Sequence, residues 1–511
     1  MSPSRGAANS TLGRIDFVLA HARRTGTLHS VLALLEWDQQ TLMPSGGGVH
    51  RAAQIEMLAG QVHEMKTNHA YRESLDALST ENLAEIASHE ERANIAVLGR
   101  ECQRLSRIPV SLVEQIARCS SESQQVWIEA RKSRDYSLLL PSLRQMFRLK
   151  KSQADALGYE SSPYDALLDE YEPQMTTAEL EPVFGKLATE LSKLVQKVCG
   201  AANAPGDEIL RRKYPVERQK KFAAWAAEEI GFDFSRGRID TTHHPFCTEV
   251  GPGDCRIATR YDEAFFPTAF FGTLHEAGHG LYEQGLRSDC YGLPSGTFCS
   301  LGIHESQSRL WENLVGRRSS FWRYCFPKAV EFFPEILSGS DHDEFVRSVN
   351  RVQPSLIRVE ADEVTYNLHI LVRFRLEKSI MEGSLEVADL PDAWNDQYES
   401  LLGIRPLHDG DGVLQDIHWP AGLVGYFPTY SLGNIYAAQL VEAAQPETGN
   451  LDELNSSGDF RPLREWMNRH VHHHGQVLRP SELLKSATGQ SVSSGALLGH
   501  LTNKCNEVYC L

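Results

Sequence analysis

Residues 270–286 read FFGTLHEAGHGLYEQGL, and this stretch carries the strongest structural and chemical signal in the chain. Apolar residues recur at helical spacing around His275 and His279, which predicts a buried α-helix. Each helical residue turns about 100° and rises about 1.5 Å, so the two histidines share one face, roughly 6 Å apart. Both imidazoles can then reach one metal ion at about 2.0–2.1 Å. We expect Gly285 to end this helix.

Glu276 directly follows the first histidine and is the candidate general base. A carboxylate there can hydrogen-bond a water whose pKa a metal lowers towards neutrality. The alternative to a metal site is that the H-E-x-x-H pattern at 275–279 occurs by chance on a solvent-exposed helix. Apolar neighbours such as Phe271 and Leu274 argue against it, because they would bury the helix. Buried histidine and glutamate side chains need partners, which a metal supplies. The pattern therefore predicts a catalytic zinc-type site.

A catalytic zinc site usually has a third protein ligand and one open position. Glu283 lies eight residues from His275, about 12 Å along the helix axis, which is too far to share an ion. The next helical segment, GIHESQSRLWENLVG (302–316), offers His304 and two plausible acids, Glu305 and Glu312. They are seven residues apart and share a face, so spacing leaves both open. The carboxylate that is not a ligand would lie on the surface or hydrogen-bond a ligand histidine.

The remaining pattern predicts a mainly α-helical fold. Apolar residues at i, i+3 and i+4 dominate the first 230 residues. Between Phe232 and Tyr261 the pattern changes to a turn signal, Gly251-Pro252-Gly253, followed by period-2 alternation, so we expect a small antiparallel sheet near the metal helix. Helical patterning returns after it, and we expect loops around 291–297, 403–412 and 419–433.

The chain has no low-complexity linker, so we expect a single domain over residues 1–511. Its N-terminal helical half covers about 1–230, and its metal and substrate half about 231–511. The net charge of −16 argues against a nucleic-acid or anionic-membrane partner, since both need a positive surface. Neither a signal peptide nor a long apolar span is evident, and the ten cysteines form no C-x-x-C pair, so we expect a cytoplasmic protein with reduced thiols.

At this point the sequence resembles the carboxypeptidase Taq family of metallocarboxypeptidases. The resemblance rests on HEAGHGLYEQG followed by GIHESQSRLWENLVG, and it extends over nearly the whole chain. Further matching blocks are LEWDQQTLMP (35–44), HPF (244–246), DCRIATR (254–260), IRVEADEVTYNLHI (357–370), GVLQDIHW (412–419) and GYFPTYSLGN (425–434). Cys247 and Cys255 are small departures from the family pattern.

The resemblance implies an enzyme that releases single residues from the C-terminus of peptides with broad specificity. It implies a mostly helical fold with a deep groove around the metal, and usually a homodimer. It assigns the third ligand to Glu305. The implied metal is zinc, with cobalt as a possible substitute.

A carboxypeptidase must hold the terminal carboxylate of its substrate, and a guanidinium can pair with it through two hydrogen bonds. Arg358, in the block IRVEAD, is the candidate that the resemblance supports. The alternative is a helical i, i+4 ion pair with Asp362. Arg256 and Arg260 are rival candidates, although contacts on the surface of the sheet suit them equally well.

The tetrahedral oxyanion of peptide hydrolysis needs hydrogen-bond donors. His418, Tyr426 and Tyr430 are candidates, in a stretch whose Gly and Pro content predicts a loop. The alternative is that they pack the wall of the groove. His244 contacts substrate or braces the sheet.

Two other functions are compatible with a metal on this helix. A metallo-oligopeptidase would cut internally and would need no carboxylate clamp. An inactive peptide-binding protein would keep the metal as a structural brace. The histidines at 470 and 472–474 we interpret as adventitious surface metal binders, because three consecutive histidines on a helix cannot converge on one ion.

Overall fold

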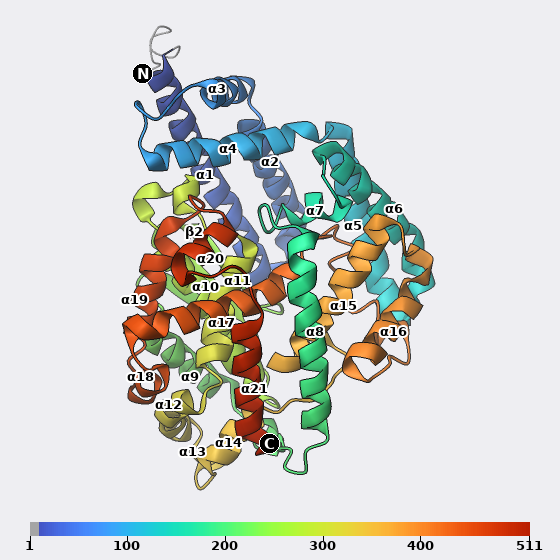
Figure 1. Cartoon of the computed structure of the whole chain (residues 1–511), viewed down its shortest axis with the longest axis vertical. Helices are drawn as coiled ribbons and strands as arrows, with labels where there is room; N and C mark the ends of the chain where they lie inside the picture. The colour runs from blue at the N-terminus through green and yellow to red at the C-terminus, as the bar shows by residue number, and fades with distance from the viewer. Residues whose placement is uncertain (1–9) are drawn as a thin grey trace.

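Helices build most of the chain, as predicted (Figure 1). The computed structural model describes residues 10–511. The helices before the sheet are α1 (Thr11–Thr41), α2 (Gly48–Lys66), α3 (His69–Thr80), α4 (His89–Arg107), α5 (Val110–Ser133), α6 (Tyr136–Leu157), α7 (Pro163–Leu168), α8 (Thr177–Cys199) and α9 (Val216–Glu229).

The helices after the sheet begin with the predicted metal helix, which ends at Gly285 as expected. They are α10 (Phe266–Gly285), α11 (Leu301–Arg309), the π-helix η5 (Leu310–Val315), α12 (Ser319–Phe332), α13 (Pro334–Leu337), α14 (His342–Val349), α15 (Glu363–Glu382), α16 (Leu390–Leu402), α17 (Pro428–Thr448), α18 (Leu451–Ser457), α19 (Arg461–His470), α20 (Pro480–Thr488) and α21 (Gly495–Tyr509).

A three-stranded sheet lies between α9 and α10 in the chain, with strands β1 (Gly237–Thr241), β2 (Phe246–Gly251) and β3 (Asp254–Thr259). The predicted turn joins β2 to β3, which pair antiparallel, and Gly253 adopts a φ of +83° there. The prediction of a wholly antiparallel sheet was wrong, because β1 pairs with β3 in parallel. The chain reverses twice between these strands, and β3 lies in the middle of the sheet.

Apolar packing joins the elements that surround the predicted metal helix. One large cluster of buried side chains draws residues from Ala130 to Tyr509, and a smaller one joins α1, α3 and α4 to Leu293. Helix α1 contacts α2, α3 and α4 at the end of the molecule where the N-terminus lies (Figure 1). Helix α10 packs against α9, β3 and α11, and α11 in turn packs against α17. The metal helix is therefore held on several sides.

The loop predicted over 419–433 ends earlier than expected. Helix α17 begins at Pro428, so Tyr430 lies in its first turn, whereas Tyr426 precedes it. Proline suits the first position of a helix because its missing N–H would have no partner there and its φ is already helical. Pro428 therefore marks a helix start, whereas Gly422 and Gly425, with φ of +79° and +92°, lie in the loop before it.

Candidate metal centre

Two histidines on α10 and a glutamate on α11 bring three possible metal ligands together. The Nε2 atoms of His275 and His279 lie 3.6 and 3.5 Å from Oε2 of Glu305. One ligand atom from each residue lies within 4.8 Å of the other two. Ligands bound tetrahedrally at about 2.0–2.1 Å are roughly 3.4 Å apart, so this donor set fits a zinc-sized ion. The two imidazoles are 19% and 13% exposed, which leaves solvent a way in.

The second nitrogen of each imidazole has an acceptor of its own. Nδ1 of His275 lies 2.9 Å from Oε2 of Glu312, and Nδ1 of His279 lies 3.1 Å from the carbonyl oxygen of His304. Both acceptors require the proton on Nδ1, which leaves the Nε2 lone pairs facing Glu305. Ligand histidines are commonly oriented in this way. Of the two carboxylates that spacing left open, Glu305 is the one at the histidine Nε2 atoms and Glu312 is a histidine partner.

Arg309 lies between these two carboxylates and hydrogen-bonds both of them. Its Nε donates to Glu305 Oε1 at 2.7 Å, and its Nη1 donates to Glu312 Oε2 at 3.1 Å. Burial alone would raise the pKa of both carboxyls, but Arg309 and the nearby histidines lower it, to about 2 for Glu312 and further for Glu305. Glu312 belongs to the π-helix η5, a type of distortion that is frequent at functional sites.

Glu276 is buried on α10 beside the predicted ligands. Removal from water raises the pKa of its carboxyl to about 7, an effect that the nearby His275 opposes and that Glu305 and Glu312 reinforce. Within residues 10–511 its carboxylate has no hydrogen-bond partner. The side chain is therefore free to accept a proton from a water or substrate in the site.

Two glycines let the three helices approach closely at this point. A Cβ on Gly278, inside the HEAGH motif, would lie 2.5 Å from the carbonyl oxygen of Gln307 on α11. A Cβ on Gly433 of α17 would lie 2.4 Å from Cγ of Glu305. Both distances are far below ordinary contact, so α11 is held between α10 and α17 only because these positions carry no side chain. Neither glycine was predicted from the sequence to have this role.

His304 and Glu283 form a further pair that sequence reasoning missed. The ring of His304 stacks on that of His279 with centroids 4.4 Å apart and planes 17° apart. Its Nε2 lies 2.8 Å from Oε1 of Glu283. Glu283, one turn beyond His279 on α10, therefore holds the residue that packs against a predicted ligand.

Arg358 is buried in a short 3-10 turn, and its ion-pair partner is Asp416. Its Nε and Nη2 lie 3.0 and 2.8 Å from Oδ1 of that aspartate, and Nη1 donates to the hydroxyl of Tyr366 at 3.2 Å. The alternative ion pair with Asp362 is wrong, because Asp362 caps α15 by accepting from the N–H groups of Val364 and Thr365.

The rival arginines lie elsewhere. Arg256 pairs with Asp254 through two hydrogen bonds and lies over the ring of Trp37 at 4.1 Å. Arg260 is exposed at the end of β3. His244 is also exposed, before β2, and within residues 10–511 its side chain makes no hydrogen bond or ion pair. The structure therefore does not bring His244 into contact with the other predicted site residues.

The three candidate donors, His418, Tyr426 and Tyr430, cluster together. Nε2 of His418 lies 3.2 Å from the hydroxyl of Tyr430, and the rings of Tyr426 and Tyr430 are 5.4 Å apart. Burial, reinforced by the charge of Glu305 and opposed by that of Arg358, raises the pKa of Tyr426 to about 12. Both tyrosines lie within electrostatic range of Glu305 and Arg358. Burial lowers the pKa of His418 to about 4 and leaves it neutral at pH 7.

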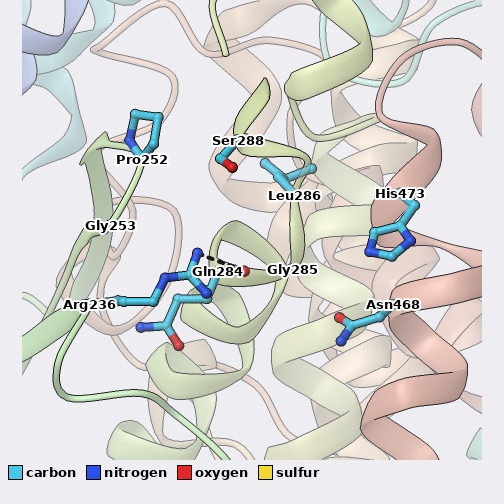
Figure 2. A pocket seen from close by; sticks show the side chains of 9 residues that line it. All are labelled: Arg236, Pro252, Gly253, Gln284, Gly285, Leu286, Ser288, Asn468 and His473. Atoms are coloured by element: carbon cyan, nitrogen blue, oxygen red, sulfur yellow. Dashed lines mark hydrogen bonds between the residues drawn. The ribbon is translucent and has the colours of Figure 1, made fainter. Parts of the chain in front are cut away.

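A separate pocket of about 480 Å³ lies at the C-terminal end of α10 (Figure 2). It is lined by Arg236, Pro252, Gly253, Gln284, Gly285, Leu286, Ser288, Asn468 and His473. Nη2 of Arg236 donates to the carbonyl oxygen of Gln284 at 3.0 Å, the dashed contact in Figure 2. The ligand set and its acceptors do not line this pocket.

The C-terminal histidines differ among themselves. His473 is exposed at this pocket, whereas His472 is buried and lies within hydrogen-bonding distance of Asn468 and Gln307. The interpretation of all these histidines as surface metal binders was therefore wrong for His472. It helps to hold α11 through Gln307 instead.

Comparisons with known proteins agree over nearly the whole chain. Residues 17–505 match the family described as carboxypeptidase Taq (M32) metallopeptidase. Thermostable carboxypeptidase 1 of Thermus thermophilus is 43% identical over 501 residues, 96% of this chain and 98% of that protein. Carboxypeptidase 1 of Bacillus subtilis is 37% identical, covering 96% and 97%. The crystal structure of an M32 carboxypeptidase from Deinococcus radiodurans R1 superposes with a TM-score of 0.94 at 39% identity, covering 98% of this chain and all of that one.

Within the described residues, no helix has the length and apolar character needed to cross a lipid bilayer.

Proposed function

The chain belongs to the carboxypeptidase Taq (M32) family of metallopeptidases, and from this premise we propose which of its residues perform the reaction. It is a metallocarboxypeptidase that acts on peptides with the help of a divalent metal. We propose that His275, His279 and Glu305 hold the ion and that Glu276 is the general base. The observation that carries this assignment is the meeting of two Nε2 lone pairs with one carboxylate oxygen.

The bound ion and the side chains of the protein would contribute different parts of the reaction. A divalent ion bound to this donor set supplies a Lewis acid for the peptide carbonyl and lowers the pKa of a water. Glu276 accepts the proton of the attacking water at its carboxylate and passes it to the nitrogen of the leaving amine. Its burial and its freedom from hydrogen-bond partners support this role. Glu312 and the carbonyl of His304 fix the orientation of the two ligand imidazoles.

Arg358 binds the terminal carboxylate, so that only the last peptide bond reaches the site. His418, Tyr426 and Tyr430 donate hydrogen bonds to the oxygen that becomes negative. The charges of Glu305 and Arg358 both act on Tyr426 and Tyr430. This supports a substrate path that runs past the two tyrosines, with Glu305 at one end and Arg358 at the other. His244 is proposed to contact longer peptides from its exposed position before β2.

We further propose zinc as the ion, with cobalt as an active substitute. Nitrogen and oxygen donors from two histidines and one carboxylate suit zinc in catalytic sites. A single domain, a homodimer, a cytoplasmic location and a deep groove around the metal also stay as proposals. Metal analysis of the purified enzyme tests the identity of the ion, and sedimentation at several concentrations tests the homodimer.

The test of the assignment is Glu276→Gln. This variant is expected to keep its full metal content and to lose most turnover, because the amide cannot accept the proton. Near-normal activity would contradict the assignment. Product analysis on one free peptide and on its C-terminal amide distinguishes the proposed carboxypeptidase from the two alternatives. These alternatives are an enzyme that cuts internally and an inactive protein that is braced by the metal. Release of single C-terminal residues from the free peptide alone supports the proposal.

A further inference from the structure

Asp416 is buried between two arginines that come from different parts of the chain. Its Oδ1 accepts hydrogen bonds from Nε and Nη2 of Arg358. Its Oδ2 accepts from Nε of Arg373 on α15 at 2.7 Å, and Nη2 of Arg373 lies 2.6 Å from the same oxygen. The Arg373 side chain is completely buried, against 8% and 9% exposure for Arg358 and Asp416. Arg373 therefore lies on the inner side of the aspartate, and Arg358 on the outer side.

The remaining contacts of Arg373 are internal. Nη1 donates to the carbonyl oxygen of His369 at 2.7 Å, and it lies 3.3 Å from the hydroxyl of Tyr398. Its guanidinium carbon lies 4.5 Å from the centroid of the Trp394 ring. A side chain enclosed in this way cannot touch a substrate, so any influence that it has on catalysis passes through Asp416.

These three side chains together carry one net positive charge. Two titratable imidazoles face them, and neither adds to the charge at neutral pH. Burial lowers the pKa of His418 to about 4, and it lowers that of His369 well below its usual value. Burial by itself would raise the pKa of Asp416, but the two guanidiniums hold it far below its usual range. Burial raises the pKa of the neighbouring phenols of Tyr398 and Tyr430, which favours their neutral form.

This charge matters because a second carboxylate is expected at Arg358. A guanidinium already paired with Asp416 would form a neutral unit, and a buried neutral pair offers little attraction for another anion. With Arg373 on the other oxygen of Asp416, the carboxylate of the aspartate is already balanced. Arg358 then keeps a full positive charge for its substrate.

The hydrogen-bond geometry leaves room for that substrate. A guanidinium has five N–H donors. Asp416 takes Nε and one donor of Nη2, and Tyr366 takes one donor of Nη1. One donor remains on each terminal nitrogen, which is as many as the two oxygens of a carboxylate need for a pair of hydrogen bonds.

We propose that Arg373 is a positioning residue for recognition of the substrate's terminal carboxylate: it balances Asp416 from inside the core, so that Arg358 is oriented and remains net positive. This inference rests on the proposed role of Arg358. The inference gives Arg373 a role in exopeptidase specificity, although Arg373 does not contact the peptide.

The test compares Arg373→Met with the double variant Arg373→Met plus Asp416→Asn. The single variant returns the net charge around Arg358 to zero, so KM for a free peptide is expected to rise about 10-fold or more while kcat changes much less. The double variant restores the charge of +1 and leaves no unpaired aspartate. Its KM is expected to return to within about 3-fold of the wild-type value. A purely structural role predicts no such rescue.

Two further variants keep the result interpretable. Arg375→Met is the matched control, because Arg375 lies on the same helix but donates to Gln397, and its KM is expected to match the wild type. Arg373→Lys keeps the charge if the methionine variant does not fold, and its KM is expected to rise less than that of Arg358→Met, because the ammonium supplies the charge but not the planar fork of the guanidinium. A rise with the lysine variant as large as that of Arg358→Met would overturn the inference.

Arg358→Met separates the two proposals. If this variant keeps the wild-type preference for a free peptide over its C-terminal amide, the clamp assignment itself fails. If it loses that preference but Arg373→Met leaves KM unchanged, or the double variant is not rescued, the clamp stands and the role of Arg373 is wrong. Circular dichroism and thermal melting of every variant confirm that folded enzyme is compared.

Discussion

Nδ1 of His275 lies 2.9 Å from Oε2 of Glu312, so the predicted ligand is oriented by a carboxylate seven residues beyond the predicted third ligand. The carboxylate is itself bound by Arg309 and lies 3.7 Å from Arg317. These contacts connect α10 to the π-helix η5. They hold the imidazole so that Nε2, and not Nδ1, faces Glu305.

Glu312→Gln is expected to weaken metal binding without abolishing it. The amide can still lie near Nδ1 of His275, but it lacks the charge that makes the imidazole a stronger ligand. Loss of such an orienting partner typically costs about 10–100-fold in metal affinity or activity. Competition with a chelator measures the affinity. Glu305→Gln serves for comparison and is expected to lose the metal far more completely; equal effects of the two variants would contradict the separate roles.

Glu276→Gln is expected to lower kcat by about 10²–10⁴-fold, the usual contribution of a general base. The metal content is expected to stay at the wild-type level, because the three ligand atoms that lie close together come from His275, His279 and Glu305 and none comes from Glu276. Steady-state kinetics and metal analysis on one sample measure both quantities. Loss of the metal together with activity would point to a structural role for Glu276.

Gly278→Ala is expected to destabilise the enzyme and reduce its metal content. The new Cβ would lie 2.5 Å from backbone atoms of α11, which cannot move aside without displacing Glu305. Overpacking of this kind costs about 1–3 kcal/mol. Denaturant unfolding and metal analysis check the change.

Gly185→Ala on α8 is the matched control for that substitution. A Cβ on this glycine would point into open space, with no neighbouring element within 4 Å. Alanine is expected to stabilise the helix there by about 0.5–1 kcal/mol, because it loses less backbone entropy on folding. Destabilisation at Gly185 as large as at Gly278 would show that close approach is not the cause.

Glu172 and Glu377 are expected to make a contribution to the free energy of unfolding that falls as pH rises from about 5 to about 8, whereas buried histidines with a lowered pKa, such as His418, contribute in the opposite direction. Glu172 and Glu377 are completely buried, and burial raises the pKa of each to about 7. Between the unfolded pKa near 4.5 and pH 7 each of these carboxyls therefore holds its proton more often in the native state than in the unfolded state, so the stability that it contributes is lost across that window. The loss is on the order of 3 kcal/mol per group at most.

Urea unfolding at several pH values measures this slope. Glu172→Gln is expected to make the slope more positive than that of the wild type, because the amide carries no proton to lose, and it can still accept from the N–H of Gly302 or the hydroxyl of Tyr436. An unchanged slope in this variant would show that Glu172 does not titrate in the window.

The local features of the site followed from the sequence. Helical spacing alone placed His275 and His279 on one face, and their ring centroids are 4.9 Å apart. The turn at 251–253 and the end of α10 at Gly285 also followed from residue type. Each of these depends on positions a few residues apart, where backbone geometry leaves little choice.

Features that depend on contacts between distant segments of the chain could not be predicted from the sequence. Spacing left both Glu305 and Glu312 open, with only a slight preference for Glu305, because the packing of α11 on α10 decides which one faces the Nε2 atoms. Asp416 was not considered as the partner of Arg358, from which it is separated by 58 residues. Nor could alternation along β3 indicate that β1 would pair with it in parallel. Such relations are set by the tertiary structure and have no local signal.

The most direct test of the metal centre is anomalous diffraction at the zinc absorption edge from crystals of the zinc-loaded enzyme. We expect one strong peak about 2.0–2.2 Å from Nε2 of His275, Nε2 of His279 and one carboxylate oxygen of Glu305. A peak bound through Nδ1 of His275 or by Glu312, or the absence of any peak between α10 and α11, would contradict the account.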